Sequence, residues 1–159
     1  MLRLSKKADY ALMAMKHLAV SSVRSDRTSH ASSSAREIAE LYDIPIELMA
    51  KVLQRLVRRG LLASTQGTRG GYQLARLPSQ ISVADVIQAI DGPVTVTACS
   101  TDEGTQCEQF SKCNVRDPLW RVREKILSAL GECTVAELAA DVPPPATVKT
   151  AVLHRSAGM

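Results

Sequence analysis

The chain has 159 residues, of which 45% are apolar and only 3% are aromatic. This length corresponds to one small domain with extensions and excludes a large catalytic barrel. Abundant aliphatic and scarce aromatic side chains favour packed helices over a β-sandwich. Twenty Lys and Arg residues against 16 Asp and Glu residues give a net charge of +4, so the meaning of the excess depends on where it is concentrated.

No apolar run reaches the roughly 18 residues that a membrane span requires, so we expect a soluble protein with no membrane partner. The N-terminal apolar stretch repeats at helical spacing and is interrupted by Asp9, Lys16 and His17, which argues against a signal peptide. The chain has four cysteines: Cys99, Cys107, Cys113 and Cys133. Without an export signal, four unevenly spaced cysteines indicate metal or redox chemistry in a cytoplasmic protein.

The first half of the chain predicts a DNA-reading unit. A helix over 5–20 is followed by a serine-rich loop over 21–34, and a second helix begins at the capping box of Ser34 and Glu37. A third helix runs from Pro45 or Ile46 to about Arg59, with an apolar back and a basic front. Residues 61–65 and 72–75 then flank a glycine-rich tip and predict a hairpin. A helix-turn-helix with a hairpin is a winged helix.

The second half predicts a connection and a long helix. Ser82 and Asp85 form a capping box that opens a helix to about Gly92, after which periodicity is lost. Asp117 is expected to cap a helix whose first residue is Pro118. Its apolar seam contains Leu119, Val122 and Ile126, which we expect to hold a dimer together. Thr134 and Glu137 cap a last short helix.

These elements predict a mainly α fold with a small β-hairpin wing, in which a winged helix-turn-helix is joined to a long dimerisation helix. The expected divisions are a DNA-binding domain (1–78), a connecting helix (79–93), a cysteine loop (94–114), dimerisation helices (115–141) and a flexible tail (142–159).

The basic residues are concentrated in the predicted reading unit, because no acidic residue occurs from Leu48 to Ala84. Such a patch attracts duplex DNA by releasing counterions, although a basic helix face is often merely solvated. We expect base reading by residues near the start of the third helix, namely Glu47, Leu48, Lys51 and Gln54. We expect phosphate contacts from Arg55, Arg58 and Arg59, and a minor-groove contact from Arg69 in the wing.

Three cysteines, Cys99, Cys107 and Cys113, share the loop that has no hydrophobic stripe. Structural zinc normally takes four ligands at short spacings, and the loop has no fourth Cys or His. Iron–sulfur clusters tolerate longer and irregular spacings, so a cluster is favoured over zinc. Isolated thiols remain the alternative to both.

Several motifs resemble one known family: the opening MLRLSKKADYAL (1–12), the wing GTRGGY (67–72), the segment ISVADVIQAIDGP (81–93) and the three-cysteine loop. Together they are similar to the IscR/NsrR family of bacterial winged-helix regulators over residues 1 to 140. Within it, the opening and the 81–93 segment look most like regulators of the SUF iron–sulfur assembly operon. The resemblance implies a homodimer that binds an operator in double-stranded DNA. It also implies one cluster per subunit, [4Fe-4S] or [2Fe-2S], held by the three loop cysteines.

The fourth cluster ligand departs from the IscR pattern. IscR-like members have a His three residues after the last cysteine, whereas this chain has Arg116, which cannot lose its proton to bind iron. NsrR-like members use an Asp in the first helix, contributed by the partner, and Asp9 occupies that place. An acid favourably placed near a helix N-terminus is the other interpretation of Asp9. Gln66 replaces the Arg common before the wing glycine, which removes one expected phosphate contact.

The function that we expect is a cluster-sensing transcription regulator, a repressor of iron–sulfur assembly genes of the SUF or ISC type. A nitric-oxide-responsive repressor is the alternative within the family. A zinc-stapled adaptor or a cluster-bearing redox protein is the alternative from another class. We expect no enzyme, because the chain has no nucleotide-binding glycine loop and no His–Asp pair for catalysis.

Overall fold

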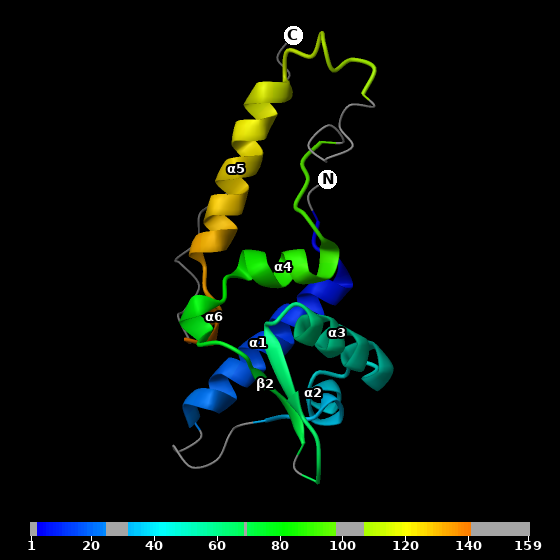
Figure 1. Cartoon of the computed structure of the whole chain (residues 1–159), viewed down its shortest axis with the longest axis vertical. Helices are drawn as coiled ribbons and strands as arrows, with labels where there is room; N and C mark the ends of the chain where they lie inside the picture. Colours follow the sequence, from blue (N-terminus) through cyan, green and yellow to red (C-terminus); the bar gives the residue numbers. More distant parts are fainter. Residues whose placement is uncertain (1–2, 25–31, 69, 98–106, 141–159) are drawn as a thin grey trace, which may run out of the picture.

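The computed structural model describes residues 3–24, 32–68, 70–97 and 107–140. Figure 1 shows a group of helices and a hairpin from which one long helix projects. The elements are α1 (Lys6–Arg24), α2 (Ala35–Leu41), α3 (Ile46–Arg58), β1 (Leu62–Thr65), β2 (Gly71–Leu74), the 3-10 turn η1 (Pro78–Gln80), α4 (Val83–Asp91), α5 (Arg116–Glu132) and α6 (Val135–Ala139). This confirms the predicted fold class. Within the described residues, no helix is long and apolar enough to cross a membrane.

The core lies around α1, which contacts α3, α4, α6 and β2. The face of α1 that meets these elements carries small residues, and Ala8, Ala11 and Ala14 are fully buried. Small side chains let neighbouring helices approach closely, while Met15 and Leu18 fill the remaining space. We call α1 to α4 together with the β1–β2 wing the head.

Helix α1 is longer than its sequence pattern predicts, because it continues to Arg24 instead of ending near residue 20. The assignment of 21–24 to a loop was therefore wrong. Serine lowers helix propensity by offering its own hydrogen bonds to the backbone, and here the Ser22 hydroxyl donates to the Ala19 carbonyl oxygen at 2.7 Å within the helix. The remainder of the serine-rich segment up to residue 31 lies outside the described residues.

Strands β1 and β2 form the predicted antiparallel wing, with Leu62 opposite Leu74. Ser33 forms an isolated β-bridge with Tyr72 of β2. The Ser33 N–H donates to the Tyr72 carbonyl oxygen at 3.1 Å, and the Tyr72 N–H donates to the Ser33 carbonyl oxygen at 2.9 Å. This approach requires glycine at position 71, where a Cβ atom would lie 2.8 Å from the Ser33 carbonyl oxygen. The start of α2 is thus tied to the wing.

Two capping boxes join the far end of the head to α5 and α6. Ser82 and Thr134 each accept a hydrogen bond from the backbone N–H three residues on, as predicted, and the two residues pair in one β-bridge. The Val83 N–H donates to the Cys133 carbonyl oxygen at 2.8 Å. The C-terminal end of α5 is therefore fixed against the start of α4.

Helix α5 begins at Arg116, and the prediction of Asp117 as its cap was wrong. Val115 occupies the cap position without a side-chain hydrogen bond. The Asp117 carboxylate instead accepts a hydrogen bond from Arg116 Nε at 2.8 Å, so an adjacent cation competes for the capping group. No residue of α5 is buried, and both views show the helix extending away from the head.

Candidate DNA-binding surface and cysteine turn

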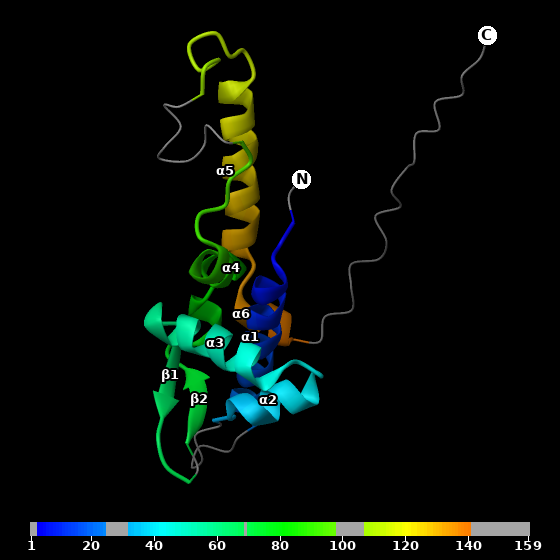
Figure 2. The ribbon, with the colours of Figure 1, turned by 90° about the vertical axis from the view of Figure 1, so that its right-hand side faces the viewer.

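Helix α3 has the two faces of a recognition helix. Its inner face is buried in the head and consists of Met49, Val52, Leu53 and Leu56. The turn before it is tight, with Asp43 at φ +52° and the Ile44 N–H donating to the Ala39 carbonyl oxygen at 2.9 Å. Asp tolerates this left-handed conformation better than most residues. Figure 2 shows α2, α3 and the wing together on the end of the molecule opposite α5.

The predicted DNA-reading residues lie on the outer part of α3. Leu48 is half-buried, and the exposed members are Glu47, Lys51, Gln54, Arg55 and Arg58, with Arg59 just after the helix. The wing residue Arg69 lies outside the described residues. Glu47 is in the first turn of α3, where an acid is favoured by the helix dipole.

Arg55 has a contact that the sequence analysis missed. Its Nε donates to the Ala89 carbonyl oxygen of α4 at 3.0 Å, so one side of the guanidinium is used to join α3 to α4. Ala89 is buried, and no sequence pattern indicates that its carbonyl oxygen accepts a side-chain hydrogen bond. Arg55 is therefore held in a defined orientation on the exposed side of α3.

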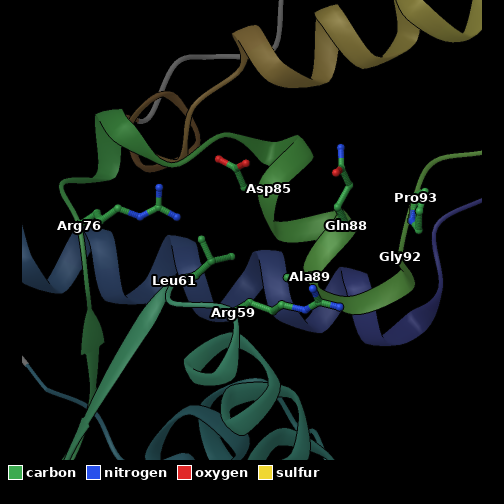
Figure 3. Close-up of a pocket in the computed structure, with 8 residues that line it drawn as sticks. All are labelled: Arg59, Leu61, Arg76, Asp85, Gln88, Ala89, Gly92 and Pro93. Carbon is green, nitrogen blue, oxygen red and sulfur yellow. The ribbon is translucent and has the colours of Figure 1, made fainter.

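Arg59 is separated from the other predicted phosphate contacts. It lines a depression of about 400 Å³ between the end of α3, the base of the wing and α4, together with Arg76 and Gln88. Figure 3 shows Arg59 and Arg76 entering this depression from different elements, with Asp85 and Gln88 above them on α4. Arg59 thus lies beside the base of the wing and α4.

The cysteine segment is described only from Cys107 onwards, and Cys99 lies outside the described residues. Cys107 is exposed and Cys113 half-buried on a turn held by hydrogen bonds from Phe110 N to Cys107 O and from Lys112 N to Gln109 O, both 3.0 Å. The turn precedes α5 at the end farthest from the head (Figures 1 and 2). Among the described residues, no three His, Cys, Asp or Glu side chains of one chain meet as a metal site.

Comparison with known proteins identifies the family. The family model Rrf2, described as an iron-dependent transcriptional regulator, matches residues 4–141. The chain belongs to the Rrf2 family. HTH-type transcriptional regulators named IscR are 34% identical in Xenorhabdus nematophila and 35% in Yersinia pseudotuberculosis, each match covering 86% of this chain and 79% of the relative. The protein is accordingly a DNA-binding transcription regulator of the IscR type.

Solved Rrf2-like structures share the fold. CymR, the global cysteine regulator of B. subtilis, has a TM-score of 0.67 and 26% identity, covering 89% of this chain and 99% of CymR. IscR of T. potens has a TM-score of 0.63 and 26% identity, covering 86% and 85% of the two chains. The relatives found by these comparisons are transcriptional regulators.

Arg116 of this Rrf2 protein is engaged by the cysteine turn. Its guanidinium carbon lies 4.8 Å from the centre of the Phe110 ring, and its Nη1 is 3.5 Å from the Phe110 carbonyl oxygen. Asp117 accepts from Nε, and the Arg116 guanidinium holds the pKa of that carboxyl below its usual value. Arg116 thus braces the turn between Cys107 and Cys113.

Two further titratable groups, one in the head and one after α5, have shifted pKa values. Burial lowers the pKa of the His17 imidazole against the opposing charge of Glu37. His17 Nε2 lies 3.2 Å from the Ser33 hydroxyl and Nδ1 lies 3.5 Å from the Tyr42 hydroxyl. Cys133 follows α5 half-buried, and burial together with Glu137 raises the pKa of its thiol, which disfavours the reactive thiolate.

Proposed function

We propose that this regulator carries an iron–sulfur cluster and controls iron–sulfur assembly genes as a cytoplasmic, homodimeric repressor. The observation that carries the proposal is the position of the cysteine segment. It connects α4, which is packed in the head, to α5, which extends away from it. A change in this segment therefore acts on both the DNA-reading unit and the proposed dimerisation helix.

Cys99, Cys107 and Cys113 would hold the cluster, with Asp9 of the partner subunit as the candidate fourth ligand. The donor chemistry fits, because thiolates suit iron–sulfur clusters and Cys107 and Cys113 lie on one exposed turn. Asp9 is exposed in the first turn of α1, so its carboxylate is accessible to a second chain. When bound, the cluster supplies sensitivity to iron, oxygen or nitric oxide.

The homodimer is supported by the exposure of α5. Val122 is 44% exposed and Trp120 is 44% exposed, while Leu119 and Ile126 are half-buried. A helix of 17 residues without a buried side chain is only marginally stable by itself. A second α5 packed along the seam would cover these side chains.

An anaerobic absorption spectrum tests the cluster. We expect a broad visible band that is lost in Cys107→Ala and Cys113→Ala and retained in Cys133→Ala, because Cys133 follows α5 beside α6. A colourless protein that contains stoichiometric zinc would support the zinc-stapled adaptor instead. A band that survives both loop substitutions would place the cluster elsewhere.

A nitric-oxide-responsive repressor is the second candidate. The observation that favours it concerns Arg116, which stands where IscR-like members have a His ligand. Arg116 contacts Phe110 and Asp117 and carries a positive charge, so it does not bind iron. Nitric oxide titration of the anaerobic protein separates the two functions. Release of DNA by nitric oxide, with no response to iron depletion, would support the second.

A further inference from the structure

A hollow of about 220 Å³ lies where the start of α1, the outer face of α3 and the end of α4 meet. Its basic lining residues come from two helices and are Lys7, Lys51, Arg55 and Arg58; the apolar ones are Leu48, Val52 and Ile90. No acidic side chain is among the described residues that line it. The hollow therefore concentrates four positive charges on the recognition-helix side of the head.

These four cations are not neutralised within the described part of the chain. The ion pair found there joins Arg116 to Asp117, far from the hollow. Positive charges gathered on one surface create a local potential that attracts anions. A fold that gathers four such groups around one hollow is suited to binding an anion.

We propose that this hollow is a seat for one phosphate group of the DNA backbone, completed by Lys7 and positioned by the end of α4. The inference rests on the proposed function as a DNA-binding regulator. The hollow of about 220 Å³ is far larger than the space that one water needs, so it accommodates a phosphate group with part of its hydration. Guanidinium groups can bind phosphate oxygens in pairs, and lysine adds a mobile point charge.

The end of α4 orients Arg55 on one side of the seat. The hydrogen bond from Arg55 Nε to the Ala89 carbonyl oxygen fixes the side chain at 3.0 Å, and Ile90, the next residue, lines the hollow. A shift of this last turn of α4 would therefore move a phosphate-binding guanidinium.

The same end of α4 holds the start of α1 on the other side. The Asp91 carboxylate accepts hydrogen bonds from the Ser5 hydroxyl at 2.5 Å and from the Ser5 N–H at 3.1 Å. The Ser5 oxygen also accepts from the Ala8 N–H at 3.1 Å, which caps the turn that contains Lys7. Gly92, at φ +82°, then directs the chain from α4 into the cysteine segment. Both sides of the seat thus depend on the helix end that leads to the proposed cluster.

Lys7→Gln and Lys6→Gln form a matched test, because both residues are exposed on α1 and only Lys7 lines the hollow. A mixed-sequence duplex is a sufficient probe, since phosphate contacts are independent of base sequence. We expect Lys7→Gln to flatten the log–log salt dependence by about 0.9 per subunit, or about 1.8 for a dimer that contains the seat twice, so the affinity change between 50 and 200 mM salt shrinks about 12-fold. Lys6→Gln should keep the wild-type slope. Equal slopes for the two variants would overturn the seat.

Asp91→Ala tests the positioning by α4 through the sign of its effect. It raises the net charge from +4 to +5, so unspecific attraction alone predicts tighter binding. If α4 positions the seat, we expect weaker DNA binding, because Ser5 and the first turn of α1 lose their hydrogen bonds to Asp91. Glu124→Ala on exposed α5 is the control with the same charge change, and it should bind at least as tightly as the wild type.

Ser5→Ala keeps the net charge and removes only the hydroxyl, so it should weaken binding even if Asp91→Ala misfolds. Binding of both variants at wild-type strength or above would overturn the role of α4. Wild-type protein that binds no duplex at low salt would overturn the proposed function itself, a result distinct from equal slopes for Lys6→Gln and Lys7→Gln.

Discussion

Val122→Asp is the substitution that most directly probes the proposed dimer. Val122 is 44% exposed in one chain. Since full burial of a valine side chain is worth about 2 kcal/mol, covering the remainder contributes about 1 kcal/mol per subunit. A symmetric dimer contains the position twice, and each buried carboxylate costs at least as much as an unpaired neutral polar group, about 1–3 kcal/mol. The loss is therefore at least about 4–8 kcal/mol, or at least about a 10³–10⁶-fold weaker association at 1.4 kcal/mol for each factor of ten.

Sedimentation equilibrium over a concentration series measures this loss. Ser128→Asp is the matched control, because it adds the same charge to the opposite face of α5, and we expect it to remain dimeric. Trp120, the chain's single tryptophan, lies on the same helix and reports its environment by fluorescence. A folded Val122→Asp protein that associates as strongly as the wild type would refute the placement of Val122 in the dimer interface.

Three other predictions concern the outer face of α3, the cap of α6 and His17. Arg58→Ala should weaken binding to every duplex and lower the salt slope by about 0.9 per subunit, or about 1.8 for a dimer. Gln54→Ala should lose about 1–3 kcal/mol per base contact on the operator and little on random DNA; equal losses on both DNAs would exclude Gln54 from base reading. Thr134→Ala should cost about 1 kcal/mol in urea unfolding, since it removes the α6 cap, and an unchanged midpoint would contradict that cap. The lowered pKa of His17 means that the unfolded chain binds the proton more readily, so stability present above the unfolded value of about 6.5 falls as the pH drops below it. His17→Gln should flatten that fall, and an unaltered pH profile would assign it to other groups.

The parts of the structure that depend on neighbouring residues were predictable from the sequence. The capping boxes at Ser34, Ser82 and Thr134 are confirmed, because each involves side chains only three residues apart. The start of α5 was not predicted correctly, since Arg116 takes the Asp117 carboxylate that was expected to cap the helix.

Contacts between segments far apart in the sequence could not be predicted from local sequence patterns. The Arg55 hydrogen bond to Ala89 joins residues 34 apart, and the Ser5 hydrogen bonds to Asp91 join residues 86 apart. Their acceptors become visible only once α4 is packed across α1 and α3. The expected roles of the cysteines, Asp9 and the DNA-contacting residues stay predictions.

The most direct test of cluster-controlled regulation is the DNA affinity of one anaerobic preparation, measured before and after removal of its cluster by fluorescence anisotropy. We expect the two affinities to differ, and we expect Cys113→Ala to bind equally under both treatments with the affinity of the cluster-free protein. Identical affinities of the wild-type protein with and without its cluster would contradict cluster-controlled regulation.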